Sequence, residues 1–153
     1  IMSDDPYTIA GEILVKGEHV MIGYYKNEEA TAAAIDKDGW LHTGDMGTID
    51  KNNNIFIRGR NKSMLLGPSG QNIYPEEIEA KLNNLPFILE SLVLENNEHQ
   101  LVAFVYPDYD AVDQAKINNA ELEIIMEANL KELNTMVANY EQVISIQPYR
   151  NEF

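Results

Sequence analysis

The fold is decided by residues 39 to 75, which contain three linked motifs: Gly39-Trp-Leu-His-Thr-Gly-Asp45, Asn54-Ile-Phe-Ile-Arg-Gly-Arg-Asn-Lys62 and Gly67-Pro-Ser-Gly-Gln-Asn-Ile-Tyr-Pro75. In the first motif a hydrophobic pair precedes Thr-Gly-Asp, and glycine lets the backbone turn without a steric penalty from a Cβ atom. The sequence therefore predicts a tight turn that presents the carboxylate of Asp45. A carboxylate in such a turn is well suited to accept two hydrogen bonds from a vicinal diol.

The second motif predicts a short strand over residues 55–57, because its residues are β-branched or aromatic. Arg58 and Arg60 follow this run and share one side of a pleated strand if the strand continues that far. A guanidinium can bind a ribose or a phosphate with its fork of donors. Singly, an Asp in a turn is more often a turn-forming residue, and an Arg at a strand end is more often solvated. The order of the motifs is what favours a binding site.

In this order and spacing the three motifs resemble those of the adenylate-forming superfamily, which includes acyl-CoA synthetases, peptide-synthetase adenylation domains and luciferases. Two further segments of the same type are Gly11-Glu-Ile-Leu-Val-Lys-Gly17 and Met21-Ile-Gly-Tyr-Tyr25. The resemblance covers most of residues 11 to 106. Within it, the segment from residue 64 to 75 looks most like bacterial long-chain fatty acid CoA ligases.

The resemblance implies an ATP-dependent, AMP-forming ligase that uses Mg2+ and coenzyme A. Such an enzyme joins a carboxylic acid to ATP as an acyl-adenylate and then transfers the acyl group to the thiol of coenzyme A. By this resemblance Asp45 holds the ribose hydroxyls and Arg60 contacts the ribose or phosphate, whereas Arg58 matches no expected contact. Lys62 matches the hinge about which a small lid domain swings. Ser63 follows it where the family often has an acidic residue.

The third motif matches the lid loop that approaches the reaction centre when the thioester forms. Gly67 and Gly70 lie in this loop, and glycines there allow the backbone to approach a narrow pantetheine arm closely. The plainer interpretation is an ordinary turn before a helix. Pro75 supports that helix, since proline fits the first helical position.

The composition limits the partners of the chain. With 25 acidic and 11 basic residues among 153, the formal net charge is −14, which argues against nucleic acid and anionic membranes as partners. There is no cysteine, hence no disulfide framework, and no apolar run approaches the ~20 residues of a membrane span. We expect small-molecule substrates and a cytoplasmic location; the oligomeric state is left open.

A segment that begins between the first two motifs resembles part of a calcium-binding loop. Asp50, Asn52 and Asn54 imitate the start of an EF-hand loop, but Ile55 and Asn61 stand where that loop needs Gly and Glu. Without a bidentate carboxylate we predict no calcium site. No other metal-binding arrangement is visible in the sequence.

The fold class expected is α+β. We predict strands over residues 11–15, 19–25, 40–42, 47–50 and 55–59, with a hairpin turn from Asp50 to Asn54, and a helix over residues 27–35 that Asn27 caps. After residue 61 we predict an αββαβ lid with a three-stranded sheet. Its helices start at Pro75 and Glu121, and its strands span residues 92–94, 101–106 and 143–146. A stripe at three- and four-residue steps in the second helix predicts a core-facing surface: Leu122, Ile125, Met126, Leu130, Leu133 and Val137.

We place a domain boundary where the composition changes. Residues 1–61 are expected to be the β-rich end of a large N-terminal domain, and residues 62–153 a truncated lid domain. The Ile1-Met2 start suggests a piece of a longer chain. In the family the catalytic lid Lys follows the last strand and would lie beyond Phe153, so the piece alone is expected to be inactive.

Two alternatives stay open on the sequence. One is a free-standing, non-catalytic nucleotide-binding or regulatory module that keeps the adenylate-site motifs. The other is a synthetase for an aryl or amino acid, because the acyl pocket lies outside these motifs.

Overall fold

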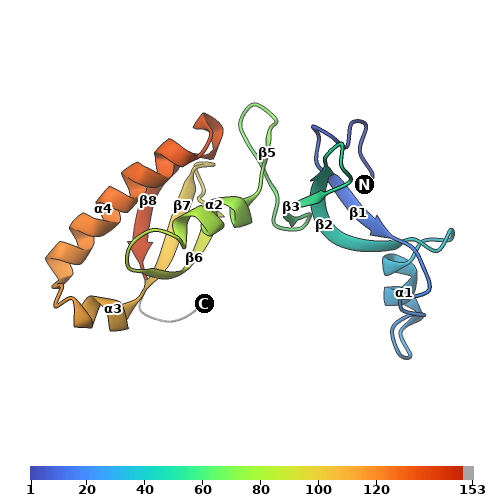
Figure 1. Cartoon of the computed structure of the whole chain (residues 1–153), viewed down its shortest axis with the longest axis horizontal. Coiled ribbons are helices and arrows are strands. Elements are labelled where there is room, and N and C mark those ends of the chain that lie inside the picture. The colour runs from blue at the N-terminus through green and yellow to red at the C-terminus, as the bar shows by residue number, and fades with distance from the viewer. Residues whose placement is uncertain (150–153) are drawn as a thin grey trace. The chain divides into compact units, whose positions relative to one another are not determined.

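The computed structural model describes residues 1–149, and the chain divides into two compact units after Ser63. Figure 1 labels the elements of both units. The division falls two residues after the predicted 61/62 boundary. The last four residues of the predicted lid, 150–153, lie outside the described residues.

The first unit is a small antiparallel sheet with one short helix. Its strands β1 (Gly11–Val15), β2 (Leu41–Ile49) and β3 (Ile55–Arg60) lie in that order in the sheet. Helix α1 (Glu28–Ala34) starts as predicted, because the side chain of Asn27 accepts a hydrogen bond from the Ala30 N–H at 3.0 Å.

The prediction of a strand over residues 19–25 is wrong. This segment is a series of bends with only an isolated bridge between Tyr24 and Asn27. The Tyr24 N–H donates to the hydroxyl of Thr31 at 2.9 Å, and the side chains of Ile22 and Tyr25 are exposed. Apolar residues favour a strand only where a neighbouring strand takes up their backbone hydrogen bonds. Here a helix side chain takes one instead.

Strand β2 runs without interruption through Asp45, whereas the sequence predicted two strand pieces around a turn. In place of the predicted turn, the strand has a local irregularity. Gly44 has a φ of +74°, and the register shifts between Met46 and Gly47. The predicted hairpin from Asp50 to Asn54 is confirmed, since the two residues exchange backbone and side-chain hydrogen bonds.

The main sheet of the second unit has three strands, as predicted, and the structure shows that their directions are mixed. Strands β6 (Ile88–Glu95) and β7 (Leu101–Pro107) are antiparallel, and β8 (Val143–Pro148) lies parallel to β7. A parallel pair needs a long crossover, which here contains helix α4 (Asn119–Met136). Helix α2 (Pro75–Leu82) also packs on this sheet, and Figure 1 shows α4 running beside β8.

The core of this unit lies between the sheet and the two helices. The predicted stripe is confirmed as core-facing: Leu122, Met126 and Leu133 are buried, and Ile125, Leu130 and Val137 pack against them. Ile78 and Leu82 of α2 are fully buried in the same cluster.

Several short elements were missed by the sequence prediction. They are β4 (Leu65–Leu66), β5 (Asn72–Ile73), α3 (Tyr109–Gln114) and the 3₁₀ turn η1 (Asn139–Glu141). Two-residue strands and a six-residue helix are too short for a hydrophobic period to show. The αββαβ description therefore gives the main elements only. No helix of the described residues has the length and apolarity to cross a membrane.

Candidate functional site

The two residues predicted to bind nucleotide lie directly opposite each other in the first unit. Asp45 of β2 and Arg60 of β3 are cross-strand partners, and Arg60 Nη1 donates to Asp45 Oδ1 at 2.7 Å. The side chains are 32% and 62% exposed, respectively. The sheet thus brings together an acceptor and a donor 15 residues apart in sequence, and solvent reaches both.

This pair suits a ligand that has both a diol and an anionic group. An ionised carboxylate accepts several hydrogen bonds, so Asp45 retains acceptor capacity beyond its bond to Arg60. A guanidinium has five donors in a fixed plane and binds phosphate or hydroxyl oxygens at its edges. A ribose and its phosphate present these two kinds of group close together.

Side chains from β1 and β2 hold the backbone around Asp45. The Glu12 carboxylate accepts from the Gly44 N–H at 3.1 Å. The Thr43 hydroxyl donates to the Ile13 carbonyl at 2.8 Å and accepts from the Asp45 N–H at 3.0 Å. Sequence reasoning missed Glu12 and Thr43. The sequence did contain a signal for Glu12, because it is the single charged residue in the otherwise apolar segment 11–15.

His42 lies against the carboxylate of Glu12. Its Nδ1 is 2.8 Å from Glu12 Oε2, and its Nε2 is 3.7 Å from Asp36 Oδ2. The hydrogen bond to Glu12 is the largest cause that raises the pKa of His42 above its ordinary value. The pKa of Asp36 is lowered, chiefly because its carboxylate accepts from the Trp40 N–H. His42 thus contacts the Glu12 side chain near the start of β2.

The predicted hinge residue lies at the end of the first unit. Lys62 is exposed in the turn that follows β3. The residue before it, Asn61, donates its N–H to the Gly44 carbonyl at 2.8 Å. The backbone beside the predicted hinge is thus tied to the residue that precedes Asp45.

The predicted coenzyme A loop belongs to the second unit. Gly67 and Gly70 close a tight turn, in which the Gly70 N–H donates to the Gly67 carbonyl at 2.9 Å. Gly70 has a φ of +82°, and a Cβ atom there would meet nothing within 4 Å. Gly67 lines a cavity of about 390 Å³ together with His99 and Tyr140.

A resident metal is not supported by the described side chains. Within residues 1–149 no group of three or more His, Asp or Glu side chains is arranged to hold an ion. Asp50 is the first residue of the segment that resembles a calcium-binding loop. Its carboxylate accepts hydrogen bonds from the N–H groups of Asn52 and Asn54 within the turn. Among these described residues we therefore assign no ligand to the Mg2+ expected with ATP.

Comparison with known proteins finds similar CoA ligases. The chain is 50% identical over 84 residues to a 3-[(3aS,4S,7aS)-7a-methyl-1,5-dioxo-octahydro-1H-inden-4-yl]propanoyl:CoA ligase of Rhodococcus jostii, which is 55% of this chain and 16% of the relative. It is 37% identical over 120 residues to a 2-succinylbenzoate–CoA ligase of Bacillus cytotoxicus, which is 76% of this chain and 24% of the relative. The chain thus spans less than a quarter of the length of these relatives.

Solved structures agree with the sequence comparison. The crystal structure of ATP-bound MatB from Rhodopseudomonas palustris superposes with a TM-score of 0.69 at 29% identity, covering 95% of this chain and 27% of that one. No family model matches the sequence. The relatives and the shared fold together show that the chain belongs to the adenylate-forming superfamily, where it matches the C-terminal region of the AMP-forming acyl-CoA ligases.

Proposed function

We propose that the complete protein containing this chain is an AMP-forming acyl-CoA ligase. The observation that supports this most is the Asp45–Arg60 pair, which offers a diol acceptor and an anion donor at one place on a sheet. The similarity to CoA ligases supplies the reaction class. In the first step a carboxylate oxygen attacks the α-phosphorus of ATP, and the bond to pyrophosphate breaks. In the second, the thiolate of coenzyme A attacks the acyl carbon, and AMP leaves.

In this proposal the residues of the chain bind and orient the nucleotide rather than form bonds with it. Asp45 accepts hydrogen bonds from the ribose hydroxyls, and Arg60 donates to the ribose or the α-phosphate. Holding the ribose at two points restricts the rotation of the α-phosphorus relative to the incoming carboxylate, which raises the rate through orientation. Arg60 also stabilises the negative charge that gathers on the phosphate oxygens.

The second unit is proposed to act as the lid. Lys62 is the hinge whose backbone angles change between the two steps, and the loop with Gly67 and Gly70 faces the pantetheine arm of coenzyme A. The Gly70 Cβ position is open, which fits close approach of a ligand to the backbone there.

A long-chain fatty acid is the acid we propose, on the resemblance of residues 64 to 75. The two CoA ligases compared above have names that specify other acids, so the acid is the finer part of the proposal. It is tested separately from the reaction class.

The test is ATP–pyrophosphate exchange by the complete gene product with a panel of acids: long-chain fatty, aryl, 2-succinylbenzoate and amino acids. Exchange that depends on one acid, followed by thioester formation with coenzyme A, is the expected result. Exchange only with an aryl or amino acid would overturn the fatty acid assignment and keep the ligase. Nucleotide binding without exchange for any acid would instead indicate the non-catalytic module.

A further inference from the structure

Side chains replace backbone hydrogen bonds around Asp45. The β1–β2 register shifts between Glu12 and Leu14, and the β2–β3 register shifts just after Asp45, between Met46 and Gly47. Backbone N–H groups at such irregularities lose their regular partners and need others. Here the Gly44 N–H donates to Glu12, and the Asp45 N–H donates to the Thr43 hydroxyl.

Glu12 uses both of its carboxylate oxygens in this arrangement. Oε1 accepts from the Gly44 N–H at 3.1 Å, and Oε2 lies 2.8 Å from Nδ1 of His42. Only 15% of the Glu12 side chain is exposed. A carboxylate that is mostly buried and doubly hydrogen-bonded holds its partners in a narrow range of positions.

The two peptide groups that flank Gly44 are each held by a hydrogen bond. The Gly44 N–H is bound by Glu12, and the Gly44 carbonyl accepts from the Asn61 N–H, one residue after Arg60. Gly44 adopts a φ of +74°, in the left-handed region that favours glycine, so it contributes to the direction of the chain entering Asp45. Loss of the Glu12 contact would leave the Gly44 N–H without its side-chain acceptor and let the Thr43–Gly44 peptide group rotate.

We propose that Glu12 is a positioning residue of the nucleotide site, which holds the Gly44–Asp45 backbone so that the Asp45 carboxylate faces the ribose diol, while His42 holds Glu12. The proposal rests on the proposed function for its ligand. Glu12 does not touch the nucleotide; it acts through Gly44 on the residue that does.

The second partner of Glu12 makes the arrangement sensitive to pH. Two acidic groups face the His42 ring: Glu12 from β1 and Asp36 from the loop after α1. Protonated His42 donates to Glu12, whereas neutral His42 donates only if its proton is on Nδ1. A Gln at position 12 can still accept from the Gly44 N–H and can donate its amide to a neutral Nδ1. It cannot donate to a protonated ring.

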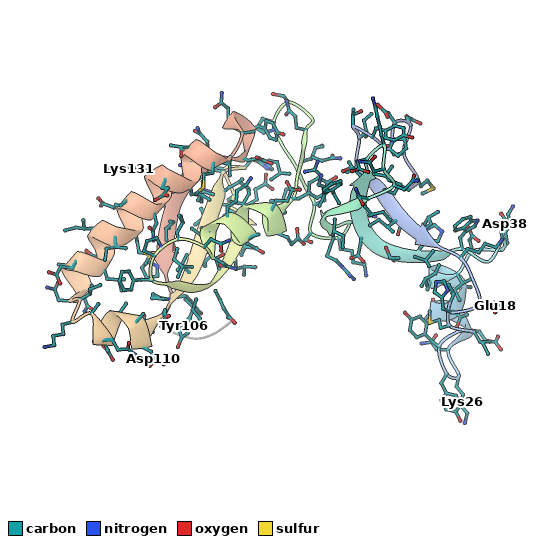
Figure 2. All side chains as sticks on the ribbon, in the orientation of Figure 1. Glu18, Lys26, Asp38, Tyr106, Asp110 and Lys131 are labelled. Carbon is teal, nitrogen blue, oxygen red and sulfur yellow. The ribbon has the colours of Figure 1, made fainter. Side chains whose placement is uncertain are left out.

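The test uses the complete gene product with Glu12→Ala, Glu12→Gln and, as a matched control, Glu18→Ala. Glu18 is labelled in Figure 2 and lies in the exposed loop after β1. The measurement is the KM for ATP and for 2′-deoxy-ATP in pyrophosphate exchange, at pH 6 and pH 8. Glu12→Ala should raise the KM for ATP about tenfold or more, as expected for one lost charge-assisted hydrogen bond. The preference for ATP over 2′-deoxy-ATP should shrink, with kcat changing less than KM.

At pH 8 the KM of Glu12→Gln for ATP should lie within about threefold of the wild-type value. At pH 6 it should be higher than that of wild type, because the protonated His42 ring repels the amide N–H. Glu18→Ala should behave as wild type. Equal losses for ATP and 2′-deoxy-ATP, or an unchanged KM in Glu12→Ala, would overturn the positioning role.

A second measurement separates this proposal from the proposed function. Hydrogen–deuterium exchange of the segment 41–49 in the same proteins should be faster in Glu12→Ala and near wild type in Glu12→Gln and Glu18→Ala. If wild-type protein shows no pyrophosphate exchange, the proposed function fails, and this measurement alone still decides whether Glu12 holds the backbone. Unchanged exchange in Glu12→Ala would refute that role.

Discussion

The guanidinium of Arg60 and the carboxylate of Asp45 face each other across two adjacent strands, with Nη1 2.7 Å from Oδ1. The pair is open to solvent, so its Coulomb energy is screened and its contribution to folding is small, about 1 kcal/mol or less. The same exposure lets a ligand reach both side chains. An exposed pair that contributes little to stability is compatible with the nucleotide-binding role that we propose for it.

Removing the carboxylate should therefore impair nucleotide use far more than stability. In the complete protein we expect Asp45→Ala to lower kcat/KM for ATP about tenfold or more, since each hydrogen bond to a charged group contributes about 1.5–3 kcal/mol. The midpoint of thermal unfolding should change little. Asp4→Ala, an exposed Asp of the same unit, is the control. An unchanged kcat/KM in Asp45→Ala would remove this residue from the site.

The His42 interaction should make the first unit less stable at higher pH. Because the folded pKa of His42 is raised above the ordinary 6.5, its contribution is fully present below about pH 6.5 and is lost as the pH rises through the raised value. The difference in unfolding free energy between wild type and His42→Gln should therefore shrink from pH 6 to pH 9. Chemical denaturation of the 153-residue chain at several pH values measures it. A difference that grows with pH would show that Glu12 does not stabilise the protonated ring.

Substitution at the predicted hinge should separate the two half-reactions. Proline fixes φ near −65° and restricts the preceding residue, here Asn61, whose N–H is bonded to Gly44. We expect Lys62→Pro to spare one half-reaction and cripple the other, and adenylation should survive if the locked state is the adenylating one. Pyrophosphate exchange and transfer from preformed acyl-adenylate to coenzyme A measure the two steps. Lys62→Ala is the control, because it keeps the backbone free to rotate. Equal losses in both steps would indicate misfolding, and no loss in either would place the hinge elsewhere.

Gly70 offers a test of the coenzyme A loop with little effect on packing. An alanine Cβ there meets no atom of the chain within 4 Å, so the cost is the backbone conformation alone, about 1–2 kcal/mol at a φ of +82°. If the loop approaches the pantetheine arm, Gly70→Ala should slow thioester formation and leave pyrophosphate exchange near wild type. Ser69→Ala, next to it, is the control for the loop sequence. Identical rates of thioester formation in both variants and wild type would remove Gly70 from the coenzyme A path.

The core of the second unit should be sensitive to a cavity at α4. Leu133 is fully buried between α4 and the sheet, so Leu133→Ala should lower the free energy of unfolding by about 2–5 kcal/mol. Lys131 lies on the same helix and is exposed, as Figure 2 shows. Lys131→Ala should change stability by no more than about 0.5 kcal/mol. Urea denaturation followed by circular dichroism compares the two, and equal effects would mean that the helix packs differently.

The sequence alone determined the features that depend on neighbouring residues in the chain. The Asn27 cap, the Asp50–Asn54 hairpin and the proline start of α2 follow from local backbone chemistry and were predicted correctly. The apolar period of α4 likewise identified its buried face, because a long helix repeats its pattern often enough to be recognised.

Only the tertiary structure decided the features that depend on partners distant in sequence. Residues 19–25 have the composition of a strand but no adjacent strand to pair with, and the chain through Asp45 is a strand because β1 and β3 flank it. Glu12 shows the same dependence most clearly. Its contacts with His42 and Gly44 join residues 30 and 32 positions apart, and they exist because an antiparallel register brings β1 beside β2. Hydrogen-bond partners across a sheet are set by strand register, and β1 and β2 have no tight turn between them that would fix that register locally.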